Sequence, residues 1–208
     1  MDLRRYENLP SSYCEWLALI PSFGAILLTG LVIKCLDDYL DQDSNNPLLT
    51  SLGRGGIVYF ILGILIAAAL DFSLVFILFS ASYIVGMFLD MTIKLPSGLP
   101  SWLESIIVAI VSIISAGLIN TFWAIMIMFS IQLLDDLLDY QNDLINQQTN
   151  YAIILGIERT VILFLLSMYI SLALQPLLSV VLLCTALFIS EALCKNLGRT
   201  ENVSFKQS

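Results

Sequence analysis

The stretch LINTFWAIMIMFSIQLLDDLLDYQND, residues 118–143, joins an uncharged apolar run to four aspartates, Asp135, Asp136, Asp139 and Asp143. Residues three and four positions apart in an α-helix share a face. The four carboxylates are therefore expected to form one stripe at the outgoing end of a helix. An apolar run of this length that ends in concentrated negative charge indicates a membrane helix whose polar end has a function.

The same pattern occurs earlier in LVIKCLDDYLDQD, residues 31–43, with Asp37, Asp38, Asp41 and Asp43. We call these four residues the first cluster, and the four aspartates of 135–143 the second cluster. Two carboxylates about 5 Å apart repel each other by roughly 3 kcal/mol at an effective dielectric constant near 20. Acids also favour helix N-termini rather than the outgoing ends where these lie. The clusters therefore predict a bound cation, and the alternative is that they are solvated helix ends.

The composition indicates one integral membrane domain over residues 1–208. Of the 208 residues, 58% are hydrophobic and 12% are charged, whereas soluble domains carry about 25% charged residues. The net charge is −8, and eight of the seventeen acids belong to the two clusters. An acidic chain is a poor candidate for binding nucleic acid.

The fold class predicted is an all-α membrane bundle of about seven transmembrane helices. The predicted spans cover roughly residues 14–36, 56–70, 72–90, 102–118, 119–134, 152–174 and 176–194. Residues 105–134 carry no charge, and as one helix they would measure about 45 Å, longer than the roughly 30 Å of hydrocarbon. We therefore expect a break between Gly117 and Asn120.

The connections predict that both clusters lie on one face of the membrane. Long polar connections at 37–55, 91–101 and 135–151 follow the first, third and fifth spans, and two crossings separate each from the next. Most basic residues fall on this long-connection face, and only Arg4 and Arg5 fall on the other. The positive-inside rule then makes the face with the clusters cytoplasmic.

The predicted cation is Mg²⁺. The sequence has no histidine, which disfavours zinc, and hard divalent ions prefer oxygen ligands. Mg²⁺ typically uses one or two carboxylates, water and a substrate phosphate. Paired aspartate motifs on one face therefore suggest binding of a diphosphate, and Lys94, Arg54 and Lys34 are the candidate phosphate contacts.

An apolar substrate tail would need a channel within the bundle. Tyr83, Phe79, Trp123 and Phe129 are candidates to line it, and aromatic faces stabilise a carbocation. The alternative for each is an ordinary position facing lipid or a neighbouring helix.

These motifs resemble the UbiA superfamily of membrane prenyltransferases. Its first signature is similar to DDYLD at residues 37–41 with Asn45, followed by NNPLLTSLGRG. Its second signature, D-x-x-D-x-x-x-D, is similar to Asp136, Asp139 and Asp143, followed by INQQTNYAIILGIERT. The loop that contains Lys94, with Tyr83 before it, resembles the one that supplies a diphosphate-binding lysine. The resemblance covers roughly residues 30–165.

The resemblance implies a Mg²⁺-dependent enzyme that ionises an allylic prenyl diphosphate and passes the prenyl group to a hydrophobic or aromatic acceptor. The implied metal ligands are Asp37, Asp38, Asp41, Asn45, Asp135, Asp136, Asp139 and Asp143. The implied catalytic residues are Asp38, Asp41, Asp136, Asp139 and Lys94. The implied diphosphate-binding residues are Lys94, Arg54, Lys34 and Tyr83.

The chain departs from that family in ways that leave alternatives open. Family members typically have nine spans, and the arginine usual before the proline after the first signature has no clear counterpart in NNPLLTS. These departures affect acceptor recognition more than ionisation of the diphosphate. A membrane terpene cyclase with the same site is the nearest alternative, and a divalent-cation transporter is a more distant one.

Overall fold

The computed structural model describes residues 11–40, 55–87, 94, 97–146 and 149–204. Within these ranges, the side chains of 11–19, 38, 40, 142, 146 and 193–204 are not described. The described residues form nine helices. Their bounds are α1 (Ser11–Leu40), α3 (Gly56–Leu70), α4 (Phe72–Gly86), α5 (Ser101–Ala116), α6 (Leu118–Leu138), α7 (Tyr140–Asn146), α8 (Tyr151–Leu155), α9 (Ile157–Leu174) and α10 (Pro176–Ser204).

The predicted all-helical class is confirmed for the described residues, where the one β-type contact is an isolated bridge between Lys94 and Pro100. In the part of the chain that the structure describes, three helical segments are long and apolar enough to cross a membrane: Ile20–Asp37, Leu118–Leu138 and Ile157–Leu174. Four shorter apolar segments coincide with the other predicted spans: Gly56–Leu70, Phe72–Gly86, Ser101–Ala116 and Pro176–Ala192. The association with membrane is therefore supported by three long helices, and seven crossings stay a prediction.

The expected break in the uncharged segment 105–134 is present. Gly117 separates α5 from α6 with φ of 86°, in the left-handed region that glycine tolerates best. The Asn120 side chain donates to the Ala116 carbonyl at 2.9 Å across this turn. Its Oδ1 also accepts from the Gln175 amide of the α9–α10 turn at 2.8 Å, so the two turns lie together.

Two predicted continuous helices are interrupted. The span predicted over 152–174 is divided at Gly156, whose φ of 89° ends α8 and starts α9. The helix predicted to carry the second cluster bends at Asp139, between α6 and α7. The hydrophobic pattern continues through both positions, so it does not reveal either break.

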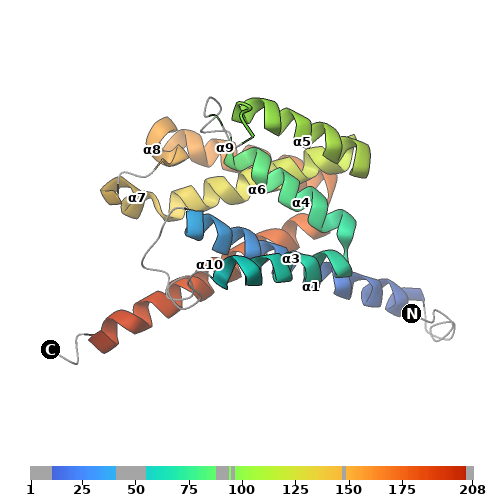
Figure 1. Ribbon diagram of the computed structural model, residues 1–208, viewed down its shortest axis with the longest axis horizontal. Helices are drawn as coiled ribbons and strands as arrows, with labels where there is room; N and C mark the ends of the chain where they lie inside the picture. The colour runs from blue at the N-terminus through green and yellow to red at the C-terminus, as the bar shows by residue number, and fades with distance from the viewer. Residues whose placement is uncertain (1–10, 41–54, 88–93, 95–96, 147–148, 205–208) are drawn as a thin grey trace.

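The centre of the bundle is formed by α4 and α6, with α1 and α10 packed against them. Leu78 and Ala81 of α4, Trp123 and Ile127 of α6, and Ile26 of α1 are all buried in one cluster. In Figure 1, α6 lies beside α4 and α9 packs against α6, with α5 along one edge and α1 and α3 along the opposite edge. The central helices therefore carry the core, while α3 and α5 are peripheral.

Polar side chains join α6 to its neighbours inside the bundle. The Trp123 indole nitrogen donates to Ser179 Oγ of α10 at 2.9 Å, and Ser130 Oγ donates to Ser167 Oγ of α9 at 2.8 Å. Small residues let helix backbones approach closely, and hydrogen bonds between helices are a common source of cohesion in membranes. Trp123 is fully buried, so the structure gives it a packing role.

The outer helices expose large apolar side chains. On α3 these include Val58 and Leu65, and on α9 they include Ile162 and Leu165. Exposing aliphatic surface to water is unfavourable, whereas contact with lipid tails carries no such cost. The exposed surface of these helices therefore fits a membrane better than water.

The helix ends sort into two sets. Figure 1 shows α1, α4 and α6 ending on the left, whereas the turns between α3 and α4, α5 and α6, and α9 and α10 lie on the right. This arrangement agrees with the predicted separation of long connections from tight turns. The end of α1, which carries Asp37, and the end of α6, which carries Asp135 and Asp136, therefore lie at the same end of the bundle.

Candidate functional site

An ion pair joins the two cluster-bearing helices. Lys34 Nζ on α1 lies 2.8 Å from Asp135 Oδ2 on α6, and the two side chains are 25% and 23% exposed. Lys34 precedes Asp37 by one helical turn on α1. The pair therefore brings the end of the first long helix against the second cluster, across 101 residues of sequence.

The second cluster keeps its helical spacing through the bend. Asp139 has φ of −93° and ψ of 5°, and its N–H donates to the Asp135 carbonyl at 2.9 Å. The Asp143 N–H donates in turn to the Asp139 carbonyl at 3.0 Å. Asp135, Asp139 and Asp143 therefore still follow one another at successive turns, although the helix axis changes direction.

Asp136 is the buried member of the second cluster. Its residue is 7% exposed. Its Oδ2 accepts from the Tyr151 backbone N–H at 2.6 Å, and its Oδ1 accepts from the Gln132 amide at 3.1 Å. Both carboxylate oxygens therefore have protein partners, and Asp136 connects the end of α6 to the start of α8.

Asn150 completes this junction and was not among the residues expected from the sequence. It is fully buried, and its amide nitrogen donates to the Asp136 carbonyl at 2.8 Å and to Asp143 Oδ2 at 2.6 Å. Its Oδ1 accepts from the N–H groups of Ala152 and Ile153, which caps α8. An asparagine directly before the apolar run YAIIL is a recognisable N-cap signal, but the contacts to the cluster required the tertiary structure.

Tyr151, beside Asn150, has an unusual hydroxyl group. Tyr151 is buried, its ring meets Phe129 edge-on at 5.8 Å, and its hydroxyl finds no hydrogen-bond partner among the described residues. Burial, together with the nearby charge of Asp136, raises the pKa of Tyr151 to about 12. The phenol therefore stays neutral at physiological pH.

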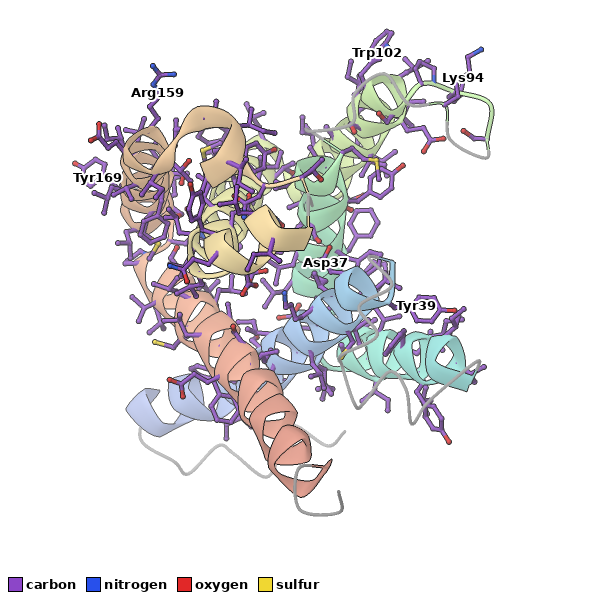
Figure 2. The ribbon with its side chains drawn as sticks, turned by 90° about the vertical axis from the view of Figure 1, so that its left-hand side faces the viewer. Asp37, Tyr39, Lys94, Trp102, Arg159 and Tyr169 are labelled. Carbon is purple, nitrogen blue, oxygen red and sulfur yellow. The ribbon has the colours of Figure 1, made fainter. Side chains whose placement is uncertain are left out.

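The first cluster is described only in part. Asp37 is partly exposed at the end of α1, on the side of the molecule that faces the viewer in Figure 2. Tyr39 beside it packs edge-on against Phe60, which fixes this end of α1 on α3. The backbone of Asp38 is helical but its side chain lies outside the described part, and the predicted residues Asp41, Asn45 and Arg54 lie outside the described residues.

The described residues do not assemble a metal site by themselves. In this part of the chain, no three acidic or cysteine side chains are grouped closely enough to hold a metal ion. Asp135 is engaged by Lys34, Asp136 by Tyr151 and Gln132, and Asp143 by Asn150. Three of the eight predicted ligands lack described side chains, so the predicted ligand set remains a hypothesis.

The predicted diphosphate contacts Lys94 and Tyr83 take other positions. The Tyr83 hydroxyl donates to Glu104 Oε2 at 2.5 Å, and the Ser97 hydroxyl donates to Glu104 Oε1, which ties α4 to the start of α5. Figure 2 shows Lys94 at the outer edge of the molecule, pointing away from Asp37. Of the two predicted basic contacts that the structure describes, Lys34 lies against an aspartate cluster and Lys94 does not.

Among the predicted channel-lining aromatics, the positions differ. Trp123 is fully buried and bonded to Ser179, whereas Phe79 lies at the surface. Phe129 lies against the core and contacts Tyr151. Phe129 is therefore close to the second cluster, because its contact Tyr151 donates its backbone N–H to Asp136.

Comparisons with protein-family models, curated proteins and solved structures returned no match for this chain. Over the residues that the structure describes, the chain is helical, has three helices long and apolar enough to span a membrane, and has two acidic helix ends linked by an ion pair.

Proposed function

We propose that the protein is a Mg²⁺-dependent membrane enzyme that ionises an allylic prenyl diphosphate and transfers the prenyl group to a hydrophobic acceptor, in the manner of UbiA-like prenyltransferases. The observation that carries the proposal is the contact of 2.8 Å between Lys34 and Asp135, because it joins the two helices that carry the aspartate motifs. The ammonium group of Lys34 already links the two helix ends. We propose that a Mg²⁺ ion also binds between them.

The donor set fits Mg²⁺ in chemistry. The clusters offer carboxylate oxygens alone, with no histidine in the chain, and hard divalent ions prefer oxygen ligands. Asp37, Asp139 and Asp143 are partly exposed at the same end of the bundle, and we assign them, with Asp38 and Asp41, as the residues that would hold the metal. Bound Mg²⁺ would neutralise the charge that develops on the departing diphosphate.

The protein's own groups divide the remaining work. Lys34, which pairs with Asp135, would also contact a phosphate oxygen of the bound diphosphate. Asp136 has both oxygens engaged and is buried, so we assign it to positioning rather than to metal binding. Binding of the prenyl tail would require the side chains packed between α4, α6 and α1 to move apart, because they form the buried core. Lys94 stays a predicted diphosphate contact, although Figure 2 shows it pointing away from Asp37.

The orientation follows from the basic residues. Lys34, Lys94 and Arg159 belong to the end that holds the clusters, and a cytoplasmic excess of lysine and arginine is the usual pattern. We therefore propose that this end faces the cytoplasm, where soluble prenyl diphosphates would reach it.

The test is release of diphosphate by the purified protein in lipid nanodiscs, with Mg²⁺ and allylic diphosphates of several chain lengths, in the presence and absence of a membrane extract. The variants are Asp37→Asn and Asp139→Asn. The matched control is Asp71→Asn, because Asp71 caps α4 at the opposite end of the bundle and an amide oxygen can still accept from Leu74.

We expect the wild type and the Asp71 variant to release diphosphate, and the two cluster variants to lose this activity while remaining folded. A prenylated lipid-soluble product supports transfer, whereas a cyclic hydrocarbon made without extract indicates a terpene cyclase. No release with any chain length contradicts the proposal and leaves a divalent-cation transporter as the remaining alternative.

A further inference from the structure

The outer side of α5 is apolar along its whole length. Trp102, Ile106, Ile110 and Ile114 follow one another at intervals of four residues, and all four are exposed. Residues four positions apart share a face of a helix. The inner side of α5 packs against α4 and α6, and Ser112 is fully buried there. The exposed stripe therefore faces away from the bundle, where lipid tails suit it better than water, and it ends at Trp102.

The length of α5 places Trp102 close to the polar edge of the membrane. At 1.5 Å per residue, the 16 residues of α5 measure about 24 Å and the 21 residues of α6 about 31 Å. The two helices meet at Gly117 and pack against each other. The start of α5 therefore lies about 7 Å inside the end of α6, where Asp135 and Asp136 mark the polar boundary. Tryptophan is enriched at this level in membrane proteins, because its ring is apolar and its N–H is polar.

Lys94 lies beside the start of α5 on the same outer margin. Its backbone forms an antiparallel bridge with Pro100, the residue directly before α5. Figure 2 shows Lys94 and Trp102 at the same edge of the molecule, with Lys94 pointing outward and away from Asp37. A lysine near the end of a membrane helix lays its methylene stem along apolar surface and extends its ammonium group to the headgroups. The edge therefore presents a positive charge next to an exposed indole ring.

The acid in the first turn of α5, Glu104, is engaged by other groups. Its Oε2 accepts from the Tyr83 hydroxyl of α4 at 2.5 Å, and its Oε1 accepts from the Ser97 hydroxyl. Ser97 Oγ also accepts from the Leu99 N–H at 3.2 Å. These bonds tie the turn before α5 to α4. The turn is therefore held in place by the protein, and both oxygens of Glu104 already have hydrogen-bond donors.

From this arrangement we propose that Lys94 and Trp102 form a binding site for the phosphate of a membrane lipid, with a preference for an anionic headgroup. The Lys94 ammonium group pairs with the lipid phosphate, and the Trp102 ring lies beside the upper part of the acyl chains. The inference goes beyond the proposed function and does not depend on it. It gives Lys94 a lipid as its ligand, whereas the resemblance implied a prenyl diphosphate; the outward direction of Lys94 favours the lipid.

The experiment measures quenching of Trp102 fluorescence by brominated lipids, with full-length protein in nanodiscs. Trp16→Phe removes a second tryptophan, and Trp123 is fully buried, so it adds a constant background. Bromine near the glycerol end or near the middle of the chain reports the depth of the ring. Brominated phosphatidylglycerol, compared with brominated phosphatidylcholine, reports the preference for an anionic headgroup. Trp102→Phe identifies the part of the signal that belongs to Trp102.

We expect bromine near the glycerol end to quench Trp102 most, and the anionic lipid to be preferred. Lys94→Gln should lower this preference about fivefold, the value of one basic residue near an anionic membrane surface, whereas Lys94→Arg keeps the charge and should retain it. Arg159→Gln is the matched control. Arg159 is also exposed, but it lies on α9, apart from Lys94 in Figure 2, so its loss should change the preference less than about twofold.

An unchanged preference in a folded Lys94→Gln protein would overturn the inference, and so would a Trp102 that no brominated lipid quenches. Circular dichroism and gel filtration report the fold.

Inorganic diphosphate, added in solution to nanodiscs of phosphatidylcholine, distinguishes a soluble ligand from a lipid. A change in Trp102 emission that Lys94→Gln abolishes would show that Lys94 serves a soluble diphosphate, which overturns the inference. No change with diphosphate, together with a lost lipid preference in Lys94→Gln, supports it. Diphosphate release, which depends on the aspartate clusters, tests the proposed function separately, so either conclusion can fail without the other.

Discussion

The ion pair between Lys34 and Asp135 joins the two helices that carry the aspartate clusters, and its strength can be measured. A double-mutant cycle with Lys34→Met, Asp135→Asn and the double variant isolates the interaction between the two side chains. Lys34 makes a further interaction besides this one, so the single Lys34 variant is expected to lose more stability than the cycle assigns to the pair.

The expected coupling free energy lies between two limits. At an effective dielectric constant of 20, opposite charges 4 Å apart attract by about 4 kcal/mol, and the observed contact is closer, at 2.8 Å. However, both side chains are about a quarter exposed, and measured values for exposed pairs are about 0.2–1 kcal/mol. Hydrogen bonds to charged groups contribute about 1.5–3 kcal/mol. We therefore expect a coupling of about 1–2 kcal/mol.

The assay is reversible unfolding in mixed detergent micelles at low and high salt, followed by circular dichroism. Raising the salt concentration from about 0.1 to about 1 M shortens the Debye length from about 10 to about 3 Å, so the coupling should decrease but not vanish for a partly buried pair. Arg159→Met is the matched control, because Arg159 is exposed on the same end of the molecule. A coupling below about 0.5 kcal/mol, within the usual error of additivity, would refute the argument that this pair holds the two helix ends together.

Two further predictions concern backbone and side-chain geometry. Gly117→Ala should destabilise the protein by about 1–2 kcal/mol, because Gly117 has a left-handed φ. Gly86→Ala, at a helical position, should be neutral or stabilise the protein by up to about 1 kcal/mol. An added Cβ meets no other atom at either position, so equal effects of the two substitutions in thermal unfolding would contradict this explanation. Asp136→Ala should lower the free energy of unfolding by about 2–4 kcal/mol, because it leaves the Tyr151 N–H without its acceptor. Asp136→Asn keeps an acceptor oxygen, so its free energy of unfolding should stay within about 1 kcal/mol of the wild type. An asparagine variant as unstable as the alanine variant in the same unfolding assay would show that charge, not the hydrogen bond, is what the position requires.

The sequence alone supplied the class of the protein and the positions of its apolar helices. Long uncharged runs determine helices locally, since every backbone N–H and C=O group must be satisfied within the segment. The break at Gly117 was predictable because hydrocarbon thickness limits the length of one span and because glycine tolerates the left-handed conformation observed there. The separation of long connections from tight turns followed from counting segments, and the helix ends agree with it.

The helix breaks and the surroundings of individual charged residues could not be predicted from the hydrophobic pattern of the sequence. The breaks at Asp139 and Gly156 lie within runs that keep a helical distribution of apolar residues, so periodicity gave no signal for them. The sequence predicted one continuous carboxylate stripe, whereas the structure separates a buried, hydrogen-bonded Asp136 from its partly exposed neighbours. Lys94, expected beside the clusters, points outward.

What the sequence determined is therefore local: which segments are apolar, where acids gather and where the backbone can turn. What only the tertiary structure decided is which partner each charged or polar group finds. Lys34 meets Asp135 across 101 residues, and Asn150 reaches Asp136 and Asp143 from a different helix. Hydrogen bonds and ion pairs act over a few ångströms, so their partners depend on how whole helices pack, and helix packing is set by the sum of many side chains rather than by any short motif.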